Sequence, residues 1–157
     1  MRQWLTPVLA GVLALTFATG AWAASSTSST STRSVADELD KAASAIDAGN
    51  YQDAIPILED VVETDPKNAD AYNYLGYSYR QLGQIEAAME HYQTALGLQP
   101  KHLGANEYLG ELYLQLGNVD KAEERLAVLD KECFFGCEEY SDLKEAIAEY
   151  KTQKGAS

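Results

Sequence analysis

Two cysteines near the carboxyl end of the chain have the spacing that most directly suggests chemistry. The chain has 157 residues, and its only two cysteines lie in the stretch Cys133-Phe134-Phe135-Gly136-Cys137. Two thiols separated by three residues could form a structural disulfide, act as a redox-active dithiol, or supply two ligands to a metal ion. The compartment that the chain enters and the elements that flank the stretch bear on this choice.

The amino end of the chain has the features of a secretory signal peptide. Arg2 supplies a positive charge, an apolar run extends from Pro7 to Thr19, and Ala21-Trp22-Ala23 has the small-x-small pattern of a cleavage site. The apolar run is too short to cross the roughly 30 Å of a bilayer core, although an uncleaved anchor is the alternative. We expect cleavage after Ala23, with export of the mature protein to the periplasm.

Export to an oxidising compartment favours a structural disulfide between Cys133 and Cys137. Gly136 permits the sharp turn that so short a loop needs. A redox role is the second interpretation, but redox motifs usually have two residues between their cysteines, and Glu138 and Glu139 would disfavour a thiolate. A metal or haem site is the third, but two sulfurs are too few for a closed zinc site and no histidine follows Cys137.

The charge of the chain limits its partners. The formal net charge is −12, and the sequence has no basic stretch. Such a chain repels phosphate backbones and anionic lipid headgroups. We therefore expect neither a nucleic-acid partner nor a membrane partner after signal cleavage.

Residues for catalysis are few. The sequence has two histidines, His91 and His102, and it contains no Gly-rich phosphate loop and no HExxH motif. We expect His91 on the exposed side of a helix and His102 in a turn, both as surface residues. The sequence therefore predicts a protein that is not an enzyme, with no catalytic residues, no cofactor and no metal site.

Internal repeats organise most of the chain, because five sets of residues recur at a spacing of 34. Apolar residues at steps of three and four predict two helices in each period. A glycine ends the first helix of each period, and a proline ends the second in two of them. The recurring sets are Gly49, Gly83 and Gly117; Ala54, Ala88 and Ala122; Leu58, Tyr92 and Leu126; Ala42, Gly76 and Gly110; and Pro66 and Pro100.

The middle period resembles a tetratricopeptide repeat (TPR). The resemblance implies an all-α fold, a helix-turn-helix solenoid of three repeats with a C-terminal capping helix. The first unit departs from the pattern in its first helix, and the third loses its closing proline. The residues that carry the pattern in the middle unit are Tyr72, Leu75, Gly76, Tyr79, Ala88, Tyr92, Ala95 and Pro100.

The resemblance also gives a domain organisation. A signal peptide over residues 1–23 precedes a Ser/Thr-rich segment, residues 24–34, which we expect to be a disordered linker because it has no apolar residue to bury. The three repeats and the capping helix are then expected at residues 35–68, 69–102, 103–134 and 137–153.

In TPR proteins the first helix of each pair lines a concave groove, and the resemblance assigns this role to specific residues here. Tyrosines beside polar side chains are typical of protein contact surfaces, although Tyr74 and Tyr108 could instead only pack between repeats. The carboxylate-binding positions of co-chaperone TPRs fall on Leu39, Ala43, Tyr74, Gly104 and Tyr108, none of which is basic or an amide. The residues assigned to the groove are Asn73, Tyr74, Tyr77, Arg80 and Gln81 of the second repeat and Glu107, Tyr108, Glu111 and Gln115 of the third.

We therefore interpret the chain as a non-catalytic periplasmic interaction module that holds a peptide or helix of an unknown partner protein in this groove. Two alternatives stay open. The first is a thiol-disulfide protein that uses Cys133 and Cys137, and the second is a scaffold that self-assembles into a homo-oligomer.

Overall fold

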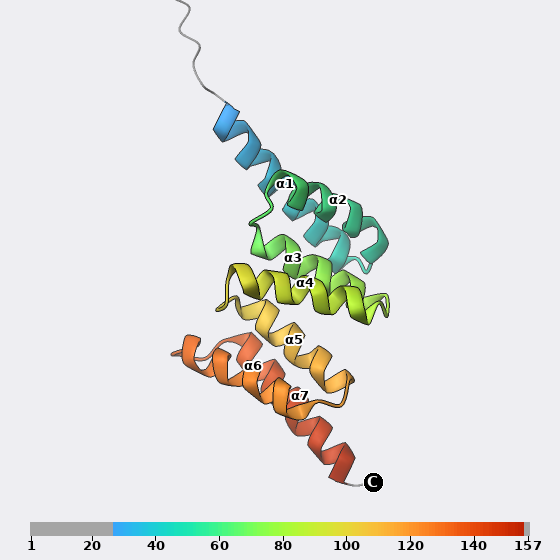
Figure 1. Ribbon diagram of the computed structural model, residues 1–157, viewed down its shortest axis with the longest axis vertical. Helices are drawn as coiled ribbons and strands as arrows, with labels where there is room; N and C mark the ends of the chain where they lie inside the picture. Colours follow the sequence, from blue (N-terminus) through green and yellow to red (C-terminus); the bar gives the residue numbers. More distant parts are fainter. Residues whose placement is uncertain (1–26, 156–157) are drawn as a thin grey trace, which may run out of the picture.

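The computed structural model describes residues 27–155, and these residues form seven helices and no strand (Figure 1). Residues 1–26 and 156–157 lie outside the described part, and so does the predicted signal peptide. The helices are α1 (Thr27–Asp47), α2 (Tyr51–Thr64), α3 (Ala69–Gln81), α4 (Ile85–Leu98), α5 (Leu103–Gln115), α6 (Val119–Glu132) and α7 (Glu138–Gly155).

The helices stack as successive antiparallel hairpins. The pairs α1–α2, α3–α4 and α5–α6 make the most extensive contacts, and α2–α3, α4–α5 and α6–α7 join each hairpin to the next. The first helices of neighbouring hairpins also touch, α1 with α3, α3 with α5 and α5 with α7. The result is an elongated stack (Figure 1). The prediction of an all-α repeat solenoid is confirmed.

The turn inside each hairpin follows from the recurring glycine. Gly83 has a φ of +73°, a left-handed conformation that L-residues with a side chain rarely adopt. Its N–H donates to the Arg80 carbonyl at 3.0 Å, and the N–H of Gln84 donates to the Tyr79 carbonyl at 2.9 Å. These bonds satisfy carbonyls at the end of α3 that have no partner within the helix. Gly49 and Gly117 repeat the conformation one period away on either side.

Glycines at the recurring position Gly76 and Gly110 let helices approach closely. A Cβ at Gly76 would lie 2.6 Å from the ring of Tyr92, which α4 buries completely against α3. A Cβ at Gly110 would lie 2.6 Å from the Leu143 side chain of α7. Leu143 is fully buried, so α7 docks by inserting this side chain over the glycine. The capping helix thus uses the same kind of contact as the repeats.

The predicted boundaries differ from the structure at both ends. Helix α1 begins at Thr27, within the predicted linker, so the expectation of disorder is wrong for residues 27–34. Once the helix has nucleated in the following segment, each added residue gains a hydrogen bond and the propensity penalty of serine and threonine is small. Helix α7 spans Glu138–Gly155 instead of 137–153, and Ser141 lies inside it, where its N–H donates to the Cys137 carbonyl.

Within the range 27–155, every helix is too short or too polar to cross a bilayer.

We predict that Gly110→Ala lowers the free energy of unfolding by about 1–3 kcal/mol, because its methyl group overpacks against Leu143. Gly97→Ala is the matched control, since nothing lies within 4 Å of a Cβ there, and it should be neutral or stabilising by about 0.5–1 kcal/mol. Urea unfolding measures both values.

A double variant tests the contact itself. If Leu143 is what the new methyl group meets, Gly110→Ala combined with Leu143→Ala loses less stability than the two single variants added together. Strictly additive losses would contradict the packing described here.

Candidate functional site

An ion pair sandwiched by aromatic rings joins the second and third hairpins. The Nη1 atom of Arg80, on α3, lies 2.6 Å from Oε2 of Glu111, on α5. The guanidinium carbon lies 5.5 Å from the centre of the Tyr77 ring and 5.6 Å from that of Tyr108. Only 8% of the Arg80 side chain is exposed. Such a pair combines a charge-assisted hydrogen bond with cation–π attraction, and it ties α3 to α5.

The tyrosines form a continuous row across the hairpins. The ring centres of Tyr77 and Tyr108 are 4.9 Å apart, and that of Tyr51 lies 6.0 Å from Tyr77. Both Tyr77 and Tyr108 are half-buried. Burial raises the pKa of Tyr108 to about 12, so its hydroxyl stays protonated at neutral pH. The two rings therefore present rigid, neutral contact area with a hydroxyl at each edge.

Glu107 is the unusual group of this face. Only 7% of the residue is exposed, and it forms no hydrogen bond or ion pair with the described residues. Burial, followed by the negative charges of Glu111, Asp142 and Glu139, raises its pKa to about 8. The Glu107 carboxyl is therefore mostly protonated at pH 7.

A second acceptor on the same face lacks a partner. Asn73, on α3, is 4% exposed, and its Oδ1 atom is buried without a hydrogen bond. The Nδ2 atom of Asn73 lies 3.1 Å from the position that a Cβ of Gly104 would take, so the amide rests against the first turn of α5. Buried polar groups are normally hydrogen-bonded, which makes this oxygen an exception that calls for an explanation.

Most residues assigned to the predicted groove come together, in arrangements that the sequence did not indicate. We call the surface that they form with the start of α7 the α3–α5–α7 face. Arg80 is not a free cation, because it forms an ion pair with Glu111. Tyr74 packs against the core cluster that α1 and α2 form with α3, and Gln81 and Gln115 are exposed at the ends of their helices. The residues that meet on the face are Asn73, Tyr77, Arg80, Glu107, Tyr108 and Glu111.

Two acidic residues of the face come from the start of α7. Asp142 is exposed and Glu139 is half-buried. In the structure their charges act on Glu107, because the insertion of Leu143 over Gly110 brings the first turns of α7 beside α5.

The expectation that both histidines are surface residues is wrong. His91 is half-buried, and its ring stacks on those of Tyr72 and Tyr79 at 6.1 and 5.2 Å. Burial also lowers the pKa of His91.

His102 is buried at the start of α5. Its Nδ1 atom accepts the N–H of Ala105 at 3.1 Å, and its Nε2 atom lies 2.9 Å from Oδ1 of Asp70. It takes the N-cap position that Asn68 fills one repeat earlier, so its role is structural. The matching position of Asn68, 34 residues earlier, was the available sequence signal.

Asn106 is a buried polar residue whose role the sequence analysis did not recognise. It occupies the position of Tyr72 one repeat later, and its Nδ2 atom donates to the carbonyls of Pro100 and His102 at 3.1 and 2.9 Å. Its Oδ1 atom accepts from Arg125 at 3.3 Å. The polar side chain at a position that holds Tyr72 in the middle repeat was the signal that could have indicated this network.

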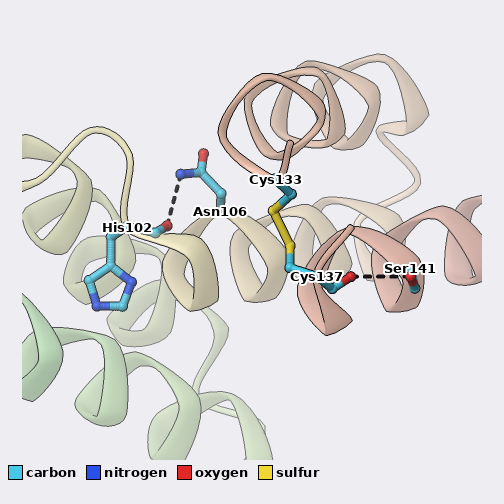
Figure 2. The surroundings of a disulfide bond; sticks show 5 residues. All are labelled: His102, Asn106, Cys133, Cys137 and Ser141. Carbon is cyan, nitrogen blue, oxygen red and sulfur yellow. Dashed lines mark hydrogen bonds between the residues drawn. A yellow bond between two sulfur atoms is a disulfide. The ribbon is translucent and has the colours of Figure 1, made fainter. Parts of the chain in front are cut away.

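The two cysteines form a disulfide between the end of α6 and the start of α7 (Figure 2). Their Cα atoms are 5.6 Å apart. Phe134 is 89% exposed and Phe135 is fully exposed, so neither covers the last repeat. The closed loop keeps them outside, and Leu143 and Ile147 of α7 cover the repeat instead.

The described residues offer no metal centre. No group of three or more histidine, cysteine or acidic side chains within residues 27–155 has the arrangement that could hold a metal ion.

Comparison with known proteins identifies the repeat type. Residues 47–129 match the family described as anaphase-promoting complex, cyclosome, subunit 3, which is built from TPR-type repeats. No curated protein sequence matches the chain.

Solved structures share the fold at low sequence identity. The type III secretion translocator chaperone SycD of Yersinia enterocolitica is 18% identical, with a TM-score of 0.69 over 78% of this chain and 95% of that one. PilF of Pseudomonas aeruginosa is 19% identical, with a TM-score of 0.70 over 80% and 56%. The first TPR domain of Spaghetti (RPAP3), solved with an HSP90 peptide, is 18% identical, with a TM-score of 0.67 over 80% and 98%. These likenesses show the fold.

We predict that Glu107→Gln removes a pH dependence of stability. Because the folded state holds a proton that the unfolded chain loses near its ordinary pKa, Glu107 makes folding less favourable as the pH rises from about 5 to 8. At about pH 8 the variant should be more stable than the wild type by about 4 kcal/mol, and near pH 4 the two should agree.

Urea unfolding at several pH values measures this difference. Glu63→Gln, an exposed substitution on α2 with the same change of charge, should follow the wild type throughout. A wild-type-like pH profile for Glu107→Gln would contradict the assigned burial of this carboxyl.

Proposed function

Because the chain belongs to the TPR family described as anaphase-promoting complex, cyclosome, subunit 3, we propose that it is a non-catalytic interaction module that binds a segment of a partner protein on its α3–α5–α7 face. The single observation that carries the proposal is the half-buried pair Tyr77 and Tyr108, held rigidly around Arg80 on helices of two different repeats.

The physical support is pre-organisation. Binding surfaces gain affinity when their side chains are already immobilised, because less conformational entropy is lost on association. The contacts of Arg80 with both rings and with Glu111 restrain the side chains of this face before any partner arrives. Tyrosine is also enriched at the energetic centres of protein interfaces.

A solved relative of the same fold supports the kind of ligand. Spaghetti (RPAP3) has been solved with a bound HSP90 peptide, SRMEEVD. For this chain we propose a different peptide chemistry, because the positions that hold a C-terminal carboxylate in co-chaperone TPRs carry Leu39, Ala43, Tyr74, Gly104 and Tyr108. The bound segment is therefore an internal peptide or a helix.

The proposed location is the periplasm, after cleavage behind Ala23. The support is the sequence of residues 1–23 together with the disulfide, because disulfides persist in oxidising compartments. A partner is then an exported protein or a second copy of this chain.

The test of the function is site-specific photo-cross-linking in the exporting cell. A photoreactive residue at Tyr77 or Tyr108 should cross-link one and the same protein, whereas one at Gln93, exposed on α4, should not. Equal cross-linking from all three positions, or none from the two tyrosine positions, would contradict the proposed binding face. A product of twice the chain's mass would identify the partner as a second copy.

The alternative of a thiol-disulfide protein is tested by removing the cysteines. The disulfide closes a loop with a sequence separation of only 4, so replacing both cysteines by serine should lower stability by about 2 kcal/mol or less. Partner cross-linking from Tyr108 should persist. A reduction potential well above about −300 mV together with loss of function would favour the redox alternative.

A further inference from the structure

We propose that the α3–α5–α7 face receives a basic side chain of the partner, a lysine or an arginine, which pairs with the carboxylate of Glu107. This inference rests on the proposed function and adds the chemistry of the ligand. The occupant is a cationic peptide segment.

The charge of the face is unbalanced. Four carboxyl groups from two helices converge there, and Arg80 is the basic group that acts on Glu107 from α3. Arg80 is already committed to Glu111 at 2.6 Å, so Glu107 lacks a counter-ion of its own among the described residues. The carboxyl groups are Glu107 and Glu111 of α5 and Glu139 and Asp142 of α7.

The burial of Glu107 indicates a donor. Glu107 is more than nine-tenths buried, and no hydrogen bond or ion pair joins its carboxyl to another described residue. Desolvated acceptors without a partner are costly, so a ligand that supplies N–H donors recovers that free energy on binding. An ammonium or a guanidinium offers several donors and no acceptor.

The aromatic rings suit the rest of such a side chain. Tyr77 and Tyr108 already hold one guanidinium, that of Arg80, within 5.6 Å of each ring centre. The methylene groups of an incoming lysine or arginine can pack on these half-buried rings, while the charge reaches Glu107. An acidic or C-terminal segment would instead bring negative charge toward four carboxyl groups, which Coulomb repulsion opposes.

Proton release gives the inference a distinct signature. Since the pKa of Glu107 is about 8 in the free protein, an incoming cation that stabilises its carboxylate displaces a proton at pH 7. Affinity should therefore rise from about pH 6 to about pH 9. The titratable and charged groups that face Glu107 are Arg80 of α3, Tyr108 and Glu111 of α5, and Glu139 and Asp142 of α7.

The experiment uses a displayed random library of peptides of roughly twelve residues, selected on the wild-type protein in about 0.3 M salt to suppress non-specific attraction. We expect the selected peptides to share a lysine or arginine at one aligned position. A synthetic copy of the leading peptide, and a version with glutamine at that position, are then titrated calorimetrically in two buffers of different ionisation enthalpy.

Glu107→Gln should weaken binding of the leading peptide at least about tenfold and abolish the proton release. Glu63→Gln, with the same change of net charge, should bind as the wild type does. Because Glu107→Gln is expected to be the more stable protein, unfolding cannot explain a loss of affinity, and circular dichroism of each variant confirms the fold.

The outcomes separate the inference from the function on which it rests. Peptides that depend on Tyr77 but share no basic residue, or that bind Glu107→Gln as well as wild type, would overturn the inference and leave the proposed function standing. A library that yields no peptide dependent on Tyr77 or Tyr108 would count against both.

Discussion

The contact between Leu143 and the backbone at Gly110 is the constraint from which the arrangement of the face follows. A Cβ at position 110 would lie 2.6 Å from the leucine, so the absence of a side chain there sets how closely α7 approaches α5. That approach buries Leu143 completely and closes the open end of the third repeat. It also carries Asp142 and Glu139 to within electrostatic reach of Glu107. The capping of the solenoid and the acidic neighbours that α7 brings to Glu107 are therefore consequences of one packing contact.

The contacts of Arg80 are the second interaction that organises the face. The positive charge of Arg80 lowers the pKa of Glu107, whereas the acidic residues that α7 brings raise it. The Arg80 guanidinium balances Glu111 and holds Tyr77 and Tyr108 at either side, which fixes α3 relative to α5. Because burial and the nearby carboxyl groups raise the pKa of Glu107 more than Arg80 lowers it, Glu107 remains protonated instead of paired. Keeping a buried carboxyl at this position lowers the stability of the fold, because a well-packed neutral residue would avoid the cost of burying an ionisable group. Costs of this kind commonly mark functional sites, where stability is exchanged for binding.

The fold was predictable from the sequence, whereas the site was predictable only in part. Residues that recur every 34 positions, such as Gly83 and Pro100, report backbone conformation and helix ends directly, so they gave the hairpins and their order. They do not indicate which basic side chain pairs with which acidic one. Arg80 and Glu111 were assigned to the groove, but their pairing is a three-dimensional relation between repeats. The surroundings of Glu107 depend on how α7 docks, and the exposure of Phe134 depends on a loop that the disulfide closes.

The most direct test of this account is an NMR titration of the Glu107 side-chain carboxyl, followed by its carbon chemical shift in the folded protein. The account predicts a midpoint near pH 8, because the carboxyl is buried and lies beside Glu111, Asp142 and Glu139. A midpoint near 4.5, the ordinary value for glutamate, would contradict it. That result would mean that Glu107 is solvated or already paired, and that the face holds no vacant partner for a cation.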